Sequence, residues 1–212
     1  MESAFFIIIL LFSVILHEIS HGAMANILGD PTAKNQGRLT LNPISHLDPV
    51  GSFFLPLLLI FLKSPFLIGW AKPVPINPHN LLNPKWDTAK IALVGPLSNV
   101  AAAIFFGLLT RFLPLPDNLL IIFSIIIFLN LLLSIFNLFP IPPLDGSKIL
   151  FAFLPPSLNY IRVFMEQFSL FLILFFLILL MKGIIPLFPV VFAVFQMIAG
   201  PQAVQSFEVF IR

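Results

Sequence analysis

The chain has 212 residues, of which 59% are hydrophobic and 9% are charged, and its mean hydropathy is +1.06. This balance excludes a water-soluble domain and indicates a polytopic protein embedded in a lipid bilayer. The formal net charge of +2 gives no indication of a nucleic-acid partner, and the lack of cysteine excludes disulfides and thiolate metal ligands.

The first apolar segment runs from Ala4 to Leu28 and predicts a membrane-spanning helix that ends at Gly29-Asp30-Pro31. A cleaved signal peptide is the alternative interpretation. The segment has no basic region before it, however, and cleavage would remove its two histidines. We therefore interpret it as a retained span.

The second half of this segment carries the string His17-Glu18-Ile19-Ser20-His21. Residues four apart lie on one helix face, so His17 and His21 can offer two imidazoles to one metal ion. Glu18 lies about 100° around the helix from His17, beside the metal, where a general base for an attacking water is needed. The alternative is a pair of packed interhelical histidines, although a plain bundle avoids the cost of burying them.

Between the first and second full spans, the apolar segments are too short to cross a bilayer as helices. Phe53 to Leu62 is apolar but has only ten residues and contains Pro56, whereas a spanning helix needs about 20. Phe66 to Pro78 carries Trp70 and several prolines, which favour extended chain. The sequence therefore predicts a re-entrant helix or extended element here, which enters the membrane and returns.

The remainder of the chain predicts two clear spans, a short partly polar helix, one more span and a shorter apolar segment. Whether this last segment crosses the membrane is left open. The ranges of these elements are Thr88–Phe112, Leu119–Phe139, Leu144–Leu154, Val163–Met181 and Ile184–Ala199. We predict an all-α polytopic membrane protein with five to six transmembrane helices. Residues 1–212 are expected to form one membrane-embedded domain, with a core at about 4–154 and C-terminal helices at about 162–200.

Outside the first helix, the carboxylate of Asp145 stands out because it lies in a proline-rich, non-helical stretch directly after a span. Irregular backbone at membrane depth is tolerated only where protein buries it or where it lines a cavity. Two histidines, one carboxylate and a water match a catalytic zinc site, so we predict Asp145 as the third ligand and one zinc per chain. The alternative is that Asp145 only caps the helix that starts at Gly146.

This ligand set constrains the topology, because His17, His21 and Asp145 can meet only at the same membrane depth. The two middle spans return the chain to its starting side, so the re-entrant element must add no crossing. The motif side then holds most basic residues: Lys34, Arg38, Lys63, Lys72, Lys85, Lys90, Lys148 and Arg162, against Arg111 and Lys182 on the other side. The positive-inside rule therefore predicts an active site towards the cytoplasm.

Three motifs follow one another in the first 150 residues of the chain. They are HEISH in an apolar helix, GPLSN at 95–99 opening a later span, and NLFPIPPLDG at 137–146. Together they resemble the site-2 protease family of intramembrane zinc metalloproteases. The segments at 37–49 and 69–75 resemble its compact prokaryotic branch, without PDZ or CBS domains.

The resemblance implies hydrolysis of a peptide bond within or near the transmembrane segment of a membrane protein substrate, in a prokaryotic plasma membrane. It also implies that His17, His21 and Asp145 bind zinc and that Glu18 is the catalytic base. One rival function is a zinc or other cation transporter, although such proteins tend to show repeats. The other is an inactive relative that binds membrane helices, against which the intact Glu18 argues. The oligomeric state is left open.

Two asparagines are weaker candidates for the site. Asn99 and Asn137 are uncharged donors at the ends of the spans that lead to Asp145, and either could hold the oxyanion or the substrate backbone. Hydrogen bonding between helices accounts for them equally well. The extended chain from Trp70 to Pro78 could supply an edge strand for an unwound substrate. We interpret His46 as a loop histidine outside the site.

Overall fold

The computed structural model describes residues 2–54, 57, 58, 61 and 71–211, and in these ranges the chain forms helices and one isolated β-bridge, Leu47 to Ala71. The all-α prediction is confirmed for this part of the chain. Half of the predicted re-entrant element at 53–78, namely residues 55–56, 59–60 and 62–70, lies outside the described residues. The helices in chain order are α1 (Glu2–Ile27), α2 (Thr32–Asn35), η1 (Pro43–His46), η2 (Pro49–Phe54), η3 (Pro78–Asn80), α4 (Pro84–Phe112), α5 (Asp117–Asn137), α6 (Asp145–Phe153), η4 (Pro156–Leu158), α7 (Asn159–Gln167), α8 (Ser169–Met181), α9 (Leu187–Ala199) and α10 (Pro201–Ile211).

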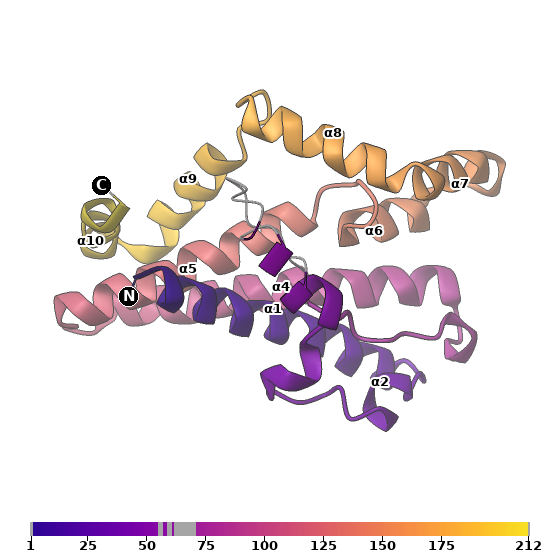
Figure 1. The fold of residues 1–212 in the computed structure, drawn as a ribbon, viewed down its shortest axis with the longest axis horizontal. Helices are drawn as coiled ribbons and strands as arrows, with labels where there is room; N and C mark the ends of the chain where they lie inside the picture. The colour runs from indigo at the N-terminus through magenta and orange to yellow at the C-terminus, as the bar shows by residue number, and fades with distance from the viewer. Residues whose placement is uncertain (1, 55–56, 59–60, 62–70, 212) are drawn as a thin grey trace.

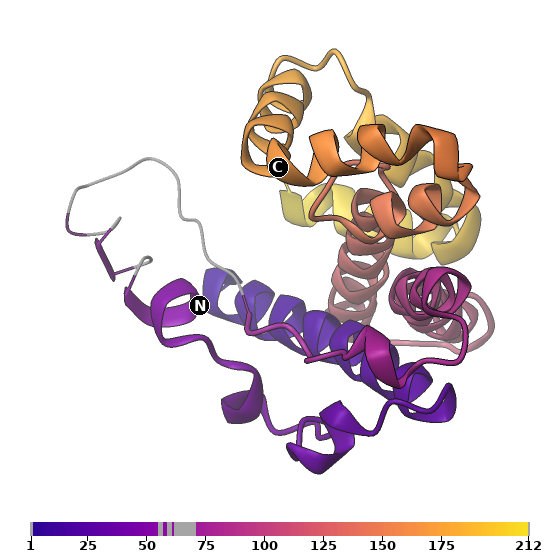
Figure 2. The ribbon, with the colours of Figure 1, turned by 90° about the vertical axis from the view of Figure 1, so that its right-hand side faces the viewer.

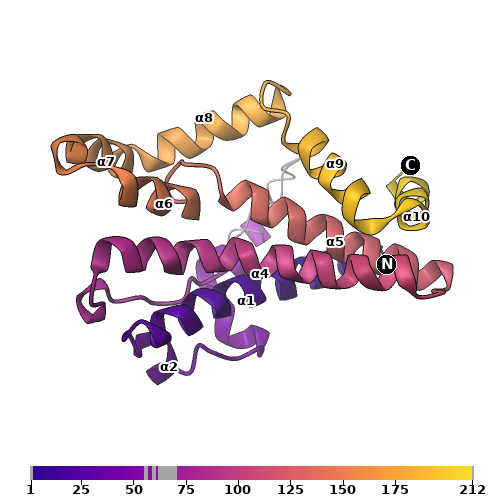
Figure 3. The same cartoon turned by 180° about the vertical axis from the view of Figure 1, so that it is seen from behind.

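Helices α1, α4 and α5 are long and apolar enough to cross a membrane. They alternate in direction, so the end of α1, the start of α4 and the end of α5 lie at one end of the bundle (Figures 1 and 3). Helices α7 and α8 meet at a bend of 73° and count as a fourth span only if they are taken together. The predicted number of five to six spans is therefore not confirmed within the described residues.

Proline positions explain two differences from the predicted helix limits. Helix α4 starts at Pro84 rather than Thr88, because a proline in the first turn needs no hydrogen-bond partner for its nitrogen and has a helical φ angle. Pro96 lies inside α4, so the pair Gly95-Pro96 does not mark the start of a helix. The stretch that begins at Pro140 separates α5 from the short helix α6, as the sequence predicts.

The C-terminal helices α9 and α10 pack against α5 and enlarge the apolar core (Figure 2). Ile125 of α5, Phe195 of α9 and Phe207 of α10 are buried in one cluster. No helix is predicted from the sequence after Ala199, so α10 is an addition. Gly200 turns the chain between α9 and α10 at a φ of +80°, which glycine adopts without strain.

The carboxylate of Asp30 ties the end of α1 to the chain that precedes α4. It is fully buried and accepts hydrogen bonds from Thr32, from the Asn77 backbone and from the Asn80 side chain. Burial raises the pKa of the Asp30 carboxyl, but these hydrogen bonds outweigh burial and lower the pKa below its ordinary value. The group is therefore ionised at neutral pH, which strengthens its hold on the chain at Asn77.

The segment Ala71–Asn77 is extended and is held at both ends. Near its start, the buried Arg38 donates from Nη2 to the carbonyl oxygen of Lys72 at 2.7 Å, and Lys72 N–H donates to the carbonyl of His46 at 2.8 Å. At its end, the Asn77 N–H donates to Asp30 at 2.6 Å. These contacts fix the segment beside the second half of α1.

Candidate metal centre

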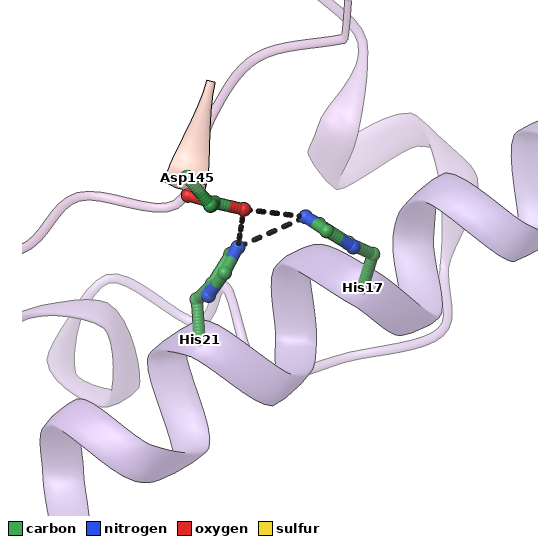
Figure 4. Close-up of side chains that lie close together, drawn as sticks. All are labelled: His17, His21 and Asp145. Atoms are coloured by element: carbon green, nitrogen blue, oxygen red, sulfur yellow. Dashed lines mark hydrogen bonds and ion pairs between the residues drawn. The ribbon is translucent and has the colours of Figure 1, made fainter. Parts of the chain in front are cut away.

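Helix α1 places His17 and His21 on one face, one turn apart, in the interior of the bundle (Figure 4). Their Nε2 atoms lie 3.0 Å apart. Each Nε2 also lies 3.0 Å from Oδ2 of Asp145, at the start of α6. Within the described residues, these three side chains form the group whose donor atoms are close enough to share a metal ion.

Asp145 reaches the histidines because α6 begins close against the end of α5. A Cβ on Gly146 would overlap the carbonyl oxygens of Leu138 and Phe139, so this close approach requires glycine. Leu144 is the N-cap residue of α6, and within the described residues the Asp145 side chain contacts His17, His21 and Lys148. Its Oδ1 accepts from Lys148 Nζ at 2.9 Å, while Oδ2 faces the histidines. Capping alone therefore does not account for this carboxylate.

Hydrogen bonds on the far side of each imidazole fix its tautomer. His17 Nδ1 donates to Oδ1 of Asn99 at 2.6 Å, and His21 Nδ1 donates to the carbonyl oxygen of Ile91 at 2.7 Å. Both partners can only accept, so each Nδ1 carries the proton and each Nε2 holds a lone pair. The two nitrogens and the Asp145 oxygen therefore repel one another unless a cation or a proton lies between them.

This donor set fits zinc. Imidazole nitrogen and carboxylate oxygen bind zinc tetrahedrally at about 2.0–2.2 Å, which separates neighbouring donors by about 3.3 Å. The three separations of 3.0 Å lie close to that value. Three protein ligands also leave one position for water or substrate, as in catalytic rather than structural zinc sites. The acceptors behind the two histidines are the kind of partner that orients zinc-binding imidazoles.

Glu18 points from α1 towards the segment Ala71–Asn77. Its Oε2 accepts the backbone N–H of Val74 at 2.8 Å, whereas Oε1 accepts no hydrogen bond from the residues that the structure describes. The segment therefore fixes the orientation of this carboxylate and leaves one oxygen free, one residue along α1 from His17.

Gly95 of α4 provides the space that the two imidazoles occupy. A Cβ at this position would lie 2.7 Å from Cε1 of His17 and would overlap the ring of His21. This glycine therefore lets α4 pack closely against α1, and the surface that it packs against is the candidate metal centre.

We expect Gly95→Ala to weaken zinc binding by about tenfold or more, because the new methyl group displaces both rings from Asp145. Zinc affinity is measured by competition with a chelator. Gly107→Ala is the matched control: it makes the same change on α4, and its Cβ would press on Ile198 of α9 rather than on the histidines. Equal affinities in Gly95→Ala and the wild type would contradict the prediction.

The comparisons with known proteins agree with this chemistry. The model of peptidase family M50 matches residues 115–181. Over 185 residues the chain is 40% identical to the Bacillus subtilis protein named "Putative zinc metalloprotease YwhC", covering 81% of this chain and 80% of that protein. The chain belongs to peptidase family M50.

Two further relatives of this M50 peptidase are named "Putative zinc metalloprotease Rip2". The protein from Mycolicibacterium smegmatis is 35% identical over 156 residues, and the one from Mycobacterium tuberculosis is 34% identical over 176 residues. These matches cover 70% and 82% of this chain but 55% and 66% of those proteins. No solved structure matches the chain.

Membership of this family establishes the class of protein to which the chain belongs. The M50 peptidase is a zinc metallopeptidase with membrane helices, and the resemblance to the site-2 proteases is confirmed. The roles of His17, Glu18, His21 and Asp145 stay predictions, supported by the way in which the fold brings them together.

The two asparagines that were weaker candidates occupy different settings in the M50 peptidase. Asn99 is fully buried behind His17, and both ends of its amide are hydrogen-bonded. Asn137 is half-buried and donates to the carbonyl of Leu133 in its own helix at 2.9 Å. The oxyanion role stays a prediction for both, but only Asn99 contacts one of the three proposed ligands.

Three residues of the site were missed by the sequence analysis. Lys148 lies three residues after Asp145, a helical spacing at which an ion pair is expected. Ser13 lies four residues before His17 and so on the same face of α1. Asn130 gives no local signal apart from being polar within a span. His46, by contrast, lies outside the three-residue group and donates to the carbonyl of Thr40 at 2.8 Å.

Proposed function

We propose that this M50 peptidase hydrolyses a peptide bond within or near the transmembrane segment of a membrane protein, using His17, His21 and Asp145 as zinc ligands and Glu18 as the general base. The observation that carries the proposal is the convergence of three lone-pair donors at 3.0 Å inside an apolar bundle. Ionisable groups at such depth are costly and mark functional sites.

The residues of the chain supply the proton transfers. When bound, zinc supplies a Lewis acid that activates water and the scissile carbonyl. Glu18 takes the proton of the attacking water at Oε1, because Val74 N–H already occupies Oε2. It then gives that proton to the nitrogen of the leaving amine, which returns Glu18 to its carboxylate form.

The segment Ala71–Asn77 is the proposed binding strand for the substrate. A transmembrane substrate must unwind locally, because its helix otherwise uses the scissile carbonyl in a hydrogen bond. Within the described residues, the N–H of Ile76 and the carbonyls of Val74 and Pro75 have no hydrogen-bond partner. Pro73 and Pro75 lack N–H groups, which is typical of a sheet edge. An unwound substrate can pair with this edge by strand addition.

The chain is proposed to act as one membrane-embedded domain over residues 1–212, with a core at about 4–154 and C-terminal helices at about 162–200. The proposal includes five to six transmembrane helices and a re-entrant element between the first and second full spans. It also includes a plasma-membrane location with the site towards the cytoplasm. The support is that α2, the start of α4, α6 and α7, which carry basic residues, lie at one end of the bundle (Figure 1).

Single cysteines test this orientation, because the chain has no cysteine of its own. We expect Lys34→Cys on α2 to react with a membrane-impermeant maleimide only after the cells are opened. Leu113→Cys, at the opposite end of α4, is expected to react in intact cells. Both positions are exposed. The reverse pattern would place the metal centre towards the outer side.

The proposed activity is tested in proteoliposomes that contain the purified protein and a library of single-span membrane proteins. Mass spectrometry of the products is expected to locate new termini within or near the apolar segment. A zinc chelator should stop their formation, and added zinc should restore it. Cleavage confined to regions distant from the membrane would contradict the proposal, as would zinc transport across the vesicles without cleavage.

A further inference from the structure

A cluster of buried polar side chains lies behind His17, on the side away from Asp145. It consists of Ser13 of α1, Asn99 of α4 and Asn130 of α5, which are 5%, 0% and 2% exposed. Polar groups in an apolar interior are costly unless they are fully hydrogen-bonded. The direction of each hydrogen bond in this cluster can therefore be worked out from its partners.

A backbone carbonyl fixes the orientation of the Asn130 amide. Its Nδ2 donates to the carbonyl oxygen of Ile126 at 2.8 Å and to Oγ of Ser13 at 2.9 Å. A carbonyl can only accept, so the nitrogen must lie on this side of the amide. The Asn130 Oδ1 therefore faces Asn99 and accepts from its Nδ2 at 2.8 Å.

The orientation of the Asn99 amide is fixed in the same way. Its Nδ2 also donates to the backbone carbonyl of Ser13 at 3.1 Å, so both of its protons are used. The Asn99 Oδ1 must therefore face His17, where it lies 2.6 Å from Nδ1. Because this oxygen can only accept, the proton of the neutral imidazole lies on Nδ1, and the lone pair of Nε2 points towards Asp145.

We propose that Ser13 and Asn130 are positioning residues that act through Asn99 to hold His17 in the tautomer that binds zinc through Nε2. The proposal rests on the proposed role of His17 as a zinc ligand. Neither residue contacts the donor atoms of the site. Without them, Asn99 Nδ2 loses its acceptor on Asn130, and only the Ser13 backbone carbonyl at 3.1 Å still opposes a turn of the amide. A turned amide offers its NH₂ group to Nδ1, which moves the imidazole proton to Nε2 and removes the lone pair.

A purely structural role in joining α1, α4 and α5 is the competing account, and the chain offers a matched control for it. Ser124 of α5 is also fully buried and donates to the carbonyl of Ala203 in α10 at 3.0 Å. Ser124→Ala therefore removes an equally buried contact between helices on α5 without touching the hydrogen bonds that lead to His17.

The experiment compares Asn130→Leu, Ser13→Ala, Ser13→Thr and Ser124→Ala with the wild type. Zinc affinity is measured by chelator competition. Solvent exchange of the His17 Nδ1 proton is measured by NMR on zinc-loaded protein labelled with 15N-histidine, of which the chain has four. Asn130→Leu and Ser13→Ala are expected to weaken zinc binding about tenfold and to speed the exchange. Ser13→Thr, which keeps the hydroxyl, should restore both, and Ser124→Ala should change neither.

Wild-type affinity and exchange in both Ser13→Ala and Asn130→Leu would overturn the proposal. An equal loss in Ser124→Ala would also overturn it, in favour of the structural role. If Asn130→Leu does not fold, Ser13→Ala decides. The variant His17→Ala separates this proposal from the proposed function: wild-type zinc affinity in that variant would refute the ligand role, whereas the position of the proton on the wild-type ring would still test the hydrogen-bond chain.

Discussion

Glu18→Gln is expected to abolish peptide cleavage while zinc stays bound. Glutamine has the shape of glutamate, and its side-chain oxygen can still accept the Val74 N–H that Oε2 accepts at 2.8 Å. An amide cannot take a proton from water, however, so the step in which Oε1 acts as the base is lost. Removing a general base typically costs 10² to 10⁴ in rate, and we expect kcat to fall by about 10³-fold.

The loss of cleavage and the retention of zinc are measured separately. Cleavage is timed in proteoliposomes with an established substrate, and the zinc content is measured on the same preparation. Glu166→Gln serves as the control, because Glu166 is exposed on α7 and, among the residues that the structure describes, pairs with Arg162 alone, at 2.9 Å. Cleavage at the normal rate by Glu18→Gln would remove Glu18 from the mechanism. Loss of zinc from this variant would show that the residue holds the metal instead.

Asp145→Ala is expected to strip the protein of its zinc. The wild type should hold about one zinc per chain, bound by two imidazoles and one carboxylate. Losing the carboxylate leaves His17 and His21 alone, and it also frees the ammonium group of Lys148, which donates to Asp145 Oδ1 at 2.9 Å. That positive charge then lies near the metal position. We expect the zinc affinity to fall by more than about 100-fold.

This measurement needs no substrate, so it can precede every cleavage assay. Helix α6 is expected to survive the change, because within the described residues the Asp145 side chain bonds to His17, His21 and Lys148 and not to the backbone of the helix. Asp117→Ala is the control: it removes an exposed carboxylate from the first turn of α5. Zinc content that is unaffected by Asp145→Ala would remove the third ligand. It would also remove the topology argument that depends on this residue meeting the histidines.

Much of the candidate site could be predicted because its parts are local patterns. His17 and His21 are four residues apart on one helix, and the helical period alone brings their side chains to one face. Asp145 stands out because a carboxylate directly after an apolar span is costly to bury, which indicates a functional role. Their meeting point could then be deduced, and the structure places their donor atoms 3.0 Å apart.

The fold was predicted less completely than the site, because much of it depends on contacts between distant helices. The apolar segments of α1, α4 and α5 are long enough to be recognised as membrane spans from composition alone. Composition also predicts a span at Val163–Met181, but it does not predict the 73° bend between α7 and α8 or the docking of α10 against the other helices. Hydropathy measures how apolar a segment is and not which neighbour it packs against.

The sequence by itself determined the membrane class, the family and the identity of the metal-binding candidates, because each depends on residue type and short-range spacing. Only the tertiary structure decided what surrounds them. Asn99 was open to either a catalytic or an interhelical role, and the fold places its oxygen on His17 Nδ1. Ser13 and Asn130 are separated by 117 positions along the chain and meet at 2.9 Å. Such contacts arise from the packing of distant helices, which no local pattern encodes.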